Sequence, residues 1–333
     1  MSKRLKFWLG IVVSLLSLVA LILLVDVEQV IATLQETDWR TAILTIALCQ
    51  VAFMFLRAWR WRIMLGSSAS FIPVFHAQNI GYLITNVLPF RLGDLARAYL
   101  VALEPKVRDV DLPKALSTVA LERILDVLVI VVLFGATLPL VPAVPEGMRA
   151  TGTLFSVAAA VGFAVMVLAA ANRSRALRLT RSILDRVKRL DTDSWLGWAD
   201  SFLDGFTILT RLPLLLPVLG HSLLLWSFIV LGYYGGIRAI WPAATGPAAA
   251  LTVCAAAFGI SIPSSPGSLG VYHLAVIAGL SVFPLPEKDA ASFAIVFHAV
   301  MVLVNVAMGL IGLWQSGRSL GRVMDAVRGL NHS

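Results

Sequence analysis

The feature that most constrains the fold of this 333-residue chain is a series of long apolar segments without any Asp, Glu, Lys or Arg. About 20 apolar residues cross a hydrocarbon layer of ~30 Å. Eight charge-free segments approach or exceed that length, namely 7–25, 41–56, 63–90, 127–145, 151–172, 212–237, 239–286 and 290–317. Charged residues make up 14% of the chain, against roughly 25% in soluble proteins. We therefore expect an all-α polytopic membrane bundle that forms a single membrane-embedded domain over residues 1–333.

The distribution of basic residues predicts the topology, because cytoplasmic loops of membrane proteins are enriched in Lys and Arg. Basic residues gather before the first segment and in the stretches 57–62, 91–114, 173–211 and 318–328. All of them lie in the cytoplasm only if 63–90 and 239–286 each enter and leave the membrane by one face. The sequence thus predicts about six full crossings, two re-entrant helical hairpins, and both termini in the cytoplasm.

Both predicted hairpins contain residues that interrupt helices. Pro73 lies in the first, and the run Ile262-Pro-Ser-Ser-Pro-Gly-Ser-Leu-Gly270 lies in the second. Non-helical backbone at membrane depth persists only where protein or a water-filled cavity satisfies its polar groups. A Pro-x-x-x-Gly pattern occurs in both, at 89–93 and 263–267, which favours an inverted repeat with a substrate site near the midplane. The alternative is that this short pattern recurs by chance.

The segment 41–56 is short for a crossing. Three arginines follow it, Arg57, Arg60 and Arg62, and their long side chains can place the charged heads at the interface. The helix is therefore expected to continue to about residue 62.

Two basic stretches are too polar to cross the membrane. In 173–211, Leu177, Thr180 and Leu184 follow a helical spacing opposite a basic face. Helices of this kind lie on the anionic cytoplasmic surface of a membrane. We expect cytoplasmic interfacial helices near 173–211 and 318–330.

The first of three polar clusters lies in 76–86. At about 100° per residue, one half of this helix carries His76, Gln78, Asn79, Tyr82, Thr85 and Asn86. A face this polar indicates a hydrated cavity, and we expect His76, Asn79 and Asn86 to contact the substrate. The alternative is a set of interhelical hydrogen bonds, worth about 0.6 kcal/mol per pair.

The second cluster is Arg91, Asp94 and Arg97, which follow a helical i, i+3 spacing. Asp94 can pair with either arginine. The other guanidinium then remains for a phosphate group, whose oxygens an arginine binds in a bidentate way. We expect the two arginines to bind an anionic head group, with Asp94 as their partner in the same substrate-binding site. The alternative is an ordinary basic cytoplasmic loop.

Glu122, Arg123 and Asp126 form the third cluster, near the start of a crossing. Glu122 and Asp126 lie on one helical face, where like charges repel unless a cation lies between them. Ionisable groups within a membrane are costly and by default mark a pathway or relay. We expect these carboxylates to pair with arginines of other segments, namely Arg60, Arg91 or Arg97. We also expect Arg60 and the three residues of this cluster to belong to the substrate-binding site. The alternative is a purely structural charge latch.

Two histidines, His273 and His298, lie in the last two apolar segments. A single buried histidine is usually a packing residue, but two such groups can exchange protons near neutral pH. We expect both to take part in the site, with hydroxyl residues of the broken stretch, namely Ser264, Ser265 and Tyr272. No third close ligand accompanies them, so neither a metal ion nor another cofactor is expected, and no residue is assigned a catalytic role.

At these residues the chain resembles the lysylphosphatidylglycerol synthase transmembrane-region family. The resemblance extends over 57–61, 86–97, 121–126, 262–273 and the Gly309-Leu-Ile-Gly312 end of the last helix. It implies a polytopic protein of the bacterial inner membrane that moves lipids or lipid-linked head groups between leaflets. Family members often carry Glu and Arg where this chain has His273 and His298, so a buried pair changes its charge here. The soluble synthase domain of some members is absent, and aminoacyl transfer is therefore not expected.

The leading hypothesis is a lipid translocase rather than an enzyme. Its partners would be membrane lipids of the phospholipid, polyprenyl or hopanoid type, and no nucleic acid is expected. The sequence contains no G-x-x-x-x-G-K-[ST] loop for nucleotide binding, so movement would be downhill or ion-coupled. The first alternative is a polyprenyl-phosphate-dependent membrane glycosyltransferase that uses Asp26 and Glu28. The second is a non-transporting scaffold that recruits a lipid-modifying enzyme through its basic surface helix.

Overall fold

The structure, a computed structural model, describes residues 19, 26–66, 69–87, 92–141, 144–185, 192–261, 266–321 and 323. Within these ranges the chain is almost entirely helical, and an isolated bridge joins Ala69 to Val107. The α-helices are α2 (Val27–Glu36), α3 (Arg40–Leu65), α4 (Phe71–Val87), α5 (Leu92–Ala102), α6 (Leu112–Thr137), α7 (Glu146–Ala171), α8 (Arg173–Leu184), α9 (Thr192–Asp204), α10 (Leu212–Ile240), α11 (Gly246–Ile260), α12 (Val271–Leu280) and α13 (Glu287–Gln315). Three short 3-10 helices lie between them, η1 (Leu138–Leu140), η2 (Thr207–Thr210) and η3 (Pro266–Ser268). The predicted all-α class is confirmed.

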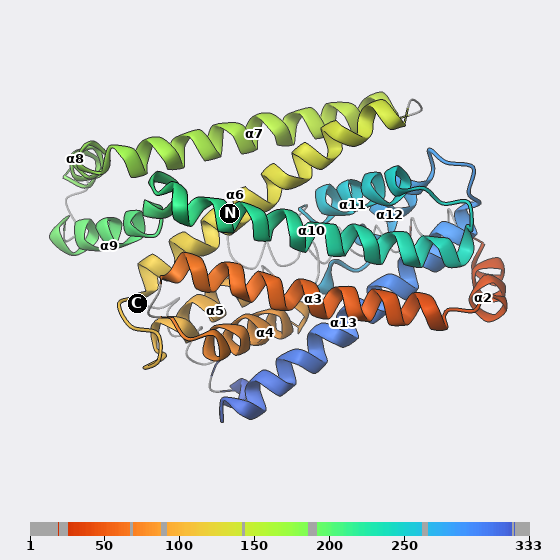
Figure 1. The fold of residues 1–333 in the computed structure, drawn as a ribbon, viewed down its shortest axis with the longest axis horizontal. Coiled ribbons are helices and arrows are strands. Elements are labelled where there is room, and N and C mark those ends of the chain that lie inside the picture. Colours follow the sequence, from red (N-terminus) through yellow and green to blue (C-terminus); the bar gives the residue numbers. More distant parts are fainter. Residues whose placement is uncertain are drawn as a thin grey trace.

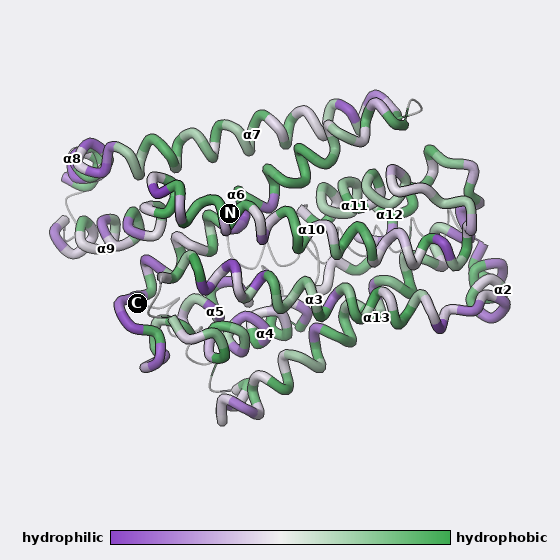
Figure 2. The backbone as a smooth tube through the Cα atoms, in the orientation of Figure 1, coloured by the Kyte–Doolittle hydropathy of each residue, from purple (hydrophilic) through white to green (hydrophobic). Residues whose placement is uncertain are grey.

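Four helices, α3, α7, α10 and α13, are long and apolar enough to cross a membrane. Of these, α3, α7 and α10 extend along the long axis of the molecule, whereas α13 and the long helix α6 cross it obliquely (Figure 1). Hydrophobic residues cover most of the length of α7, α10 and α13 (Figure 2), and large side chains such as Leu154, Leu224 and Leu303 are exposed there. Large exposed apolar surfaces are typical of proteins embedded in lipid or bound to partners. The predicted membrane bundle fits this surface. Apart from Val19, the expected first crossing at 7–25 lies outside the described residues, so the count of six crossings stays a prediction.

Local sequence signals set the start of two helices that build the site. Asp111 caps α6, and its side chain accepts a hydrogen bond from the backbone N–H of Lys114. Thr245 caps α11 through the backbone N–H of Ala248. Both helices carry proline in the first turn, where the missing N–H has no helical partner to lose.

The first hairpin lies further along the chain than predicted. Helix α3 continues without a break to Leu65, and Pro73 lies in the first turn of α4, where proline is compatible with a helix. The expected hairpin at 63–90 was therefore wrong in its bounds. The inward arm is α4, and the return arm is α5. The two arms are antiparallel and very close, because a Cβ added at Gly93 would collide with the carbonyl oxygen of Gly81.

The second hairpin consists of α11 and α12, which pack against each other. They are antiparallel: a Cβ on Gly259 would collide with Ala275, and one on Gly279 would lie 2.9 Å from the Cα of Thr252. The chain between them leaves helical geometry at Gly267 and Gly270, whose φ angles are +68° and +80°. A break in this stretch was predicted from its prolines and glycines.

The two hairpins approach each other from opposite ends of the bundle (Figure 1). Their inner ends meet, since η3 packs against α4 and a Cβ on Gly267 would lie 4.0 Å from the backbone oxygen of Asn86. This opposed arrangement agrees with the one inferred from the charge distribution. The Pro-x-x-x-Gly patterns fall largely on residues outside the described ranges, so the inverted repeat stays a prediction.

Helices α8 and α9 lie together at one end of the bundle (Figure 1). The side chain of Leu179 on α8 is exposed, as are Trp195 and Trp198 on α9. Basic residues and exposed apolar side chains on the same helices are typical of a membrane surface. The predicted interfacial helices near 173–211 thus have helical counterparts, whereas most of 318–330 lies outside the described residues.

Candidate functional site

A cluster of charged side chains lies inside the bundle where three helices meet. Its members are Arg57 and Arg60 from α3, Asp94 and Arg97 from α5, and Glu122, Arg123 and Asp126 from α6. Arg60 and Glu122 are fully buried, and Arg57, Arg97 and Asp126 are nearly so. Asp94 and Arg123 are partly exposed. Four guanidinium groups therefore face three carboxylates, which leaves a formal excess of one positive charge.

Glu122 is the centre of this cluster. Its carboxylate forms ion pairs with three arginines, Arg97 at 2.5 Å, Arg60 at 3.2 Å and Arg57 at 3.8 Å. Asp126 pairs with Arg60 at 2.8 Å and with Arg57 at 3.0 Å. The expected pairing of these carboxylates with Arg60 and Arg97 is thus confirmed. The expectation that Arg57 and Arg60 reach the interface was wrong, because both are held inside by the i, i+4 carboxylates of α6.

Asp94 lies on α5, the return arm of the first hairpin, and ties this arm to the cluster. It pairs with Arg123 at 2.5 Å and with Arg97 at 3.3 Å. The Arg97 guanidinium also lies 4.6 Å from the ring centroid of Trp61 and donates a hydrogen bond to Gln78 at 3.1 Å. Each contact comes from a different helix, so the guanidinium is held in one place. Arg91, the third member of the predicted i, i+3 set, lies outside the described residues.

A cavity of about 440 Å³ adjoins the cluster. Its charged end is lined by Arg57, Asp94, Arg97, Arg123 and Asp126. One wall is the polar face of α4, with Gln78, Tyr82, Thr85 and Asn86. Other parts of the lining are apolar and come from α6, α7, α10 and α11, with Val127, Ile130, Phe155, Ile229 and Phe258 among them. The cavity therefore combines a cationic end with apolar walls.

Two residues of the predicted polar face of α4 do not line this cavity. His76 lies at a second cavity of about 330 Å³, beside Glu104, Lys106 and Arg318. Asn79 is fully buried, on a turn of α4 whose backbone approaches Gly309 of α13. The polar face predicted for α4 is therefore divided among three surroundings. Asn86 lines the main cavity, His76 lines the second cavity, and Asn79 lies in the packing contact with α13.

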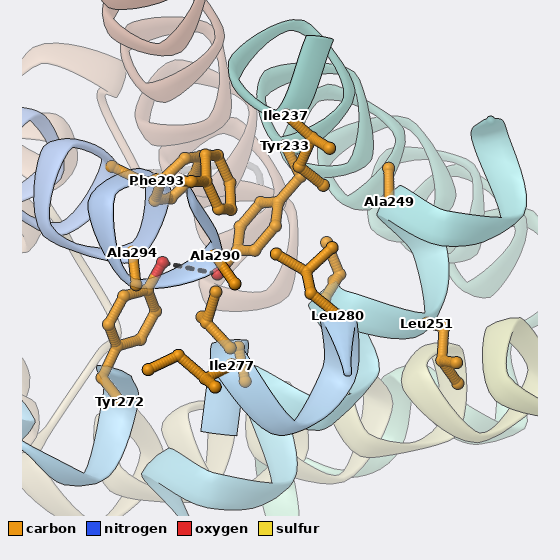
Figure 3. Close-up of a cluster of buried hydrophobic side chains, with 14 of the residues drawn as sticks. Tyr233, Ile237, Ala249, Leu251, Tyr272, Ile277, Leu280, Ala290, Phe293 and Ala294 are labelled. Carbon is orange, nitrogen blue, oxygen red and sulfur yellow. Dashed lines mark hydrogen bonds between the residues drawn. The ribbon is translucent and has the colours of Figure 1, made fainter. Parts of the chain in front are cut away.

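The second hairpin and α13 close the other end of the main cavity. Tyr272 and His298 line it. His273 lies behind them, with its Nε2 atom 3.4 Å from Nδ1 of His298. The hydroxyl of Tyr272 is hydrogen-bonded to that of Tyr233 at 2.8 Å within a buried apolar cluster (Figure 3). The predicted partners Ser264 and Ser265 lie outside the described residues.

The amino-acid sequence matches a known protein family. The sequence profile of the lysylphosphatidylglycerol synthase TM region matches residues 7–309. The chain belongs to that family. Together with the long apolar helices, this identifies a multi-pass integral membrane protein and confirms the family suggested by the sequence motifs.

One relative is similar to part of this chain. Glycosyltransferase AglD of Haloferax volcanii is 30% identical over 164 residues, which make up 47% of this chain and 24% of that protein. This chain therefore matches about a quarter of the length of that relative. No solved structure matches the chain.

Several polar residues of this family member were missed by the sequence reasoning. Gln50 of α3 donates a hydrogen bond to Asn305 of α13 at 2.9 Å, and both line the cavity. Each is a polar residue within a long apolar segment, which was a usable signal. Trp226 of α10 lies 3.4 Å from Asp126, and Ser222 accepts a hydrogen bond from Arg60 at 2.9 Å. Neither gave a sequence signal, because both types are common in membrane helices.

Within the described ranges, no group of three His, Cys, Asp or Glu side chains could hold a metal ion.

Proposed function

We propose that this protein translocates a lipid with an anionic head group between the leaflets of the bacterial inner membrane, with both termini in the cytoplasm. The observation that carries the proposal is the buried arginine cluster with its excess positive charge, which opens into a cavity with apolar walls. Phospholipids and lipid-linked anionic head groups are the proposed partners. Hydrophobic tails would stay in the bilayer while the head group passes through the cavity.

The chemistry of the cluster suits a phosphate group. Arginine binds phosphate oxygens through paired N–H groups and stays charged in apolar surroundings. Arg97 and Arg123 line the cavity, and Arg123 keeps 41% of its side chain accessible. Glu122 and Arg60 do not line it. We assign them the role of holding the arginines in place, because a buried guanidinium needs a paired carboxylate.

The surroundings of the cavity suit the acyl chains. Phe155 of α7 and Ile229 of α10 line it. Both helices are among those apolar enough to span the membrane, and few residues of α7 are buried in the protein. A head group in the cavity would therefore have lipid-facing helices beside it, and its tails would need no polar passage.

A vesicle assay tests the proposal directly. The purified full chain is placed in liposomes that contain a fluorescent phosphatidylglycerol, and a membrane-impermeant reductant bleaches the outer leaflet. We expect bleaching to proceed past the outer-leaflet fraction, and Arg123→Gln to slow this second phase about tenfold, as loss of a charge-assisted hydrogen bond would. Arg238→Gln is the matched control, because this arginine lies near the end of α10 against Tyr234. Bleaching that stops at the outer-leaflet fraction, as in empty vesicles, would overturn the proposal for this lipid.

The similarity to glycosyltransferase AglD favours one other function, sugar transfer from a polyprenyl-phosphate donor. The acidic residues considered for it lie at the start of α2. Asp26 caps that helix, since its side chain accepts hydrogen bonds from the N–H groups of Glu28 and Gln29. Glu28 is exposed and remains the candidate base. Under this alternative, Glu28→Gln abolishes sugar transfer, whereas under the translocase proposal it leaves lipid movement unchanged.

A further inference from the structure

The uncharged end of the main cavity contains a buried polar atom without a partner. His298 lines the cavity and is only 3% exposed. Among the described residues, its Nε2 atom has no hydrogen-bond partner. The backbone of Gly267 lies close enough to the ring for a weak hydrogen bond, but the contact falls outside standard hydrogen-bond geometry. Buried polar atoms are rarely left unpaired, and such an atom beside a cavity points to a ligand.

Hydrogen bonds behind His298 fix which nitrogen carries the proton. The backbone N–H of Gly270 donates to Nδ1 of His273 at 3.3 Å, so this Nδ1 is bare and the proton of a neutral His273 is on Nε2. That N–H can then donate to Nδ1 of His298, 3.4 Å away. By the same reasoning, the neutral His298 ring carries its proton on Nε2. The chain of bonds therefore ends in an N–H donor beside the cavity.

Neighbouring aromatic rings hold this donor in place. The Tyr272 ring lies 4.8 Å from the His298 ring, centroid to centroid. The Tyr272 hydroxyl is already bonded to Tyr233 (Figure 3), so it does not compete for the imidazole nitrogen. The imidazole is thus restrained on one side by His273 and on another by Tyr272.

The donor lies far from the arginine cluster. Helices α3 and α13 run in the same direction, because both begin at the α2 end, where Thr33 of α2 donates to Asp289 of α13 (Figure 1). Gln50 and Asn305 join these helices at one level. Arg57 is seven residues beyond Gln50, and His298 is seven residues before Asn305. At 1.5 Å per residue, the two backbones are roughly 20 Å apart along the bundle, about two-thirds of the hydrocarbon thickness.

We propose that the Nε2–H group of His298 is a second binding site for phosphate oxygens, distinct from the arginine cluster and occupied by the head group at the other end of its path. This inference rests on the proposed translocase function. A neutral donor binds an anion more weakly than a guanidinium does. Weak binding at this end favours release, because a permeating group must be held at successive sites but must also be able to leave.

Nitrogen-15 NMR of the histidine rings tests the site without measuring transport. The full chain, with its five histidines labelled, is studied in maltoside micelles, which contain no phosphate. His298→Leu assigns the signal. We expect a protonated Nε2 and a bare Nδ1 at His298, and we expect the Nε2 signal to shift when dihexanoyl phosphatidylglycerol is added. Dihexanoyl glycerol, which lacks the phosphate, should leave the signal unchanged.

Inorganic phosphate provides the arm that separates the two sources of this ligand. A shift with phosphatidylglycerol that phosphate alone does not reproduce supports a lipid head group. An equal shift with phosphate alone overturns the assignment to a lipid. A proton on Nδ1, or a signal that no phosphate compound moves, overturns the site.

Transport variants distinguish failure of this site from failure of the proposed function. His298→Leu should slow vesicle translocation about tenfold, the effect of losing one hydrogen bond to a charged group. His298→Gln should retain most of the rate, because its amide can present an N–H near the same place. If the wild-type protein moves lipid and His298→Leu is equally fast, the second site is wrong and the translocase stands. If the NMR shift appears but no lipid moves, the site stands and the translocase is wrong.

Discussion

The two hairpins have the same construction and opposite chemistry. In each, two short antiparallel helices pack closely at glycine, Gly81 against Gly93 in the first and Gly279 against Thr252 in the second. The arm α5 carries Asp94 and Arg97, which form ion pairs with Arg123 and Glu122 of α6. The second hairpin has no Asp, Glu, Lys or Arg anywhere in 239–286.

This difference indicates two ways to hold a short helix inside a membrane bundle. Ion pairs can fix α5 because α6 supplies a partner for each of its charges, Glu122 for Arg97 and Arg123 for Asp94. The α11–α12 pair relies on small-residue packing, since ten of the fifteen residues of α11 are buried and six are alanine. Small residues let membrane helices approach closely and gain van der Waals contact. Charge neutralisation should therefore damage the first hairpin severely, whereas steric changes should damage both.

The largest expected effect is at the centre of the ion-pair cluster. Glu122→Gln keeps the shape of the side chain but leaves Arg57, Arg60 and Arg97 short of one negative charge. Removing one partner of a buried ion pair costs about 3–5 kcal/mol. We expect a large fall in the thermal unfolding temperature of the detergent-purified protein.

Asp193→Asn is the matched control for this variant. Asp193 also pairs with an arginine, Arg181 at 3.8 Å, but both side chains are mostly exposed. Such a pair contributes at most about 1 kcal/mol. Equal unfolding temperatures for Glu122→Gln and the wild type would show that the first hairpin does not depend on its charges.

The next effect compares the close contacts of the two hairpins. A Cβ at Gly93 would collide with Gly81 and Thr85, whereas one at Gly279 would lie 2.9 Å from Thr252 and 3.0 Å from Ala255. Overpacking typically costs about 1–3 kcal/mol. We expect Gly93→Ala to lower the unfolding temperature more than Gly279→Ala, and to slow lipid movement more, because it shifts Arg97.

Gly135→Ala controls for the effect of replacing glycine in a helix. Nothing lies within 4 Å of a Cβ added there, and removing a helical glycine is stabilising by about 0.5–1 kcal/mol. If Gly279→Ala proves more damaging than Gly93→Ala, the second hairpin is the more tightly constrained of the two.

The comparison also shows which parts of the fold could be predicted from sequence. The lengths of the charge-free segments predicted the all-α class, and the prolines and glycines of 262–270 predicted the break between α11 and α12. The bounds of the first hairpin were wrong because the charges of α5 were taken to mark a cytoplasmic loop. The positive-inside rule counts basic residues, and it cannot recognise an arginine such as Arg97 that is buried against Glu122.

The site was predictable only in its strongest charges. An i, i+4 pair of carboxylates in an apolar helix requires cations, and this reasoning led to Arg60. The role of Arg57 depends on how α3 is rotated relative to α6, which no local pattern specifies. The same is true of the hydrogen bond between Gln50 and Asn305, whose partners lie 255 positions apart.

A smaller effect is expected where the charged and uncharged halves of the cavity meet. Gln50 and Asn305 are both buried, and they join α3 to α13. Side-chain hydrogen bonds between membrane helices contribute about 0.6 kcal/mol on average and up to about 1.7 kcal/mol. A double-mutant cycle with Gln50→Leu and Asn305→Leu should give a coupling energy in this range. A coupling energy near zero would mean that the two halves of the cavity are held together by other contacts.

The smallest effect should come from ion pairs at the α8–α9 end, which test whether burial or charge alone distinguishes the first hairpin. Asp204 of α9 pairs with Lys114 at 2.7 Å and with Arg173 at 3.5 Å. Partial burial tends to raise the pKa of the Asp204 carboxyl, but the hydrogen bond and charge of Lys114, together with Arg173, lower that pKa below its usual value. A lowered pKa in the folded state contributes stability above the unfolded pKa of about 4, and this contribution is lost as the pH falls through the folded value. Because the pair is partly exposed, Asp204→Asn should lower the free energy of unfolding by at most about 1 kcal/mol at neutral pH. Unfolding curves of the variant and the wild type should converge in acid.

A loss of stability as large as that of Glu122→Gln would mean that charge pairing matters equally at the surface and in the interior. The contrast between the two hairpins would then not depend on burial.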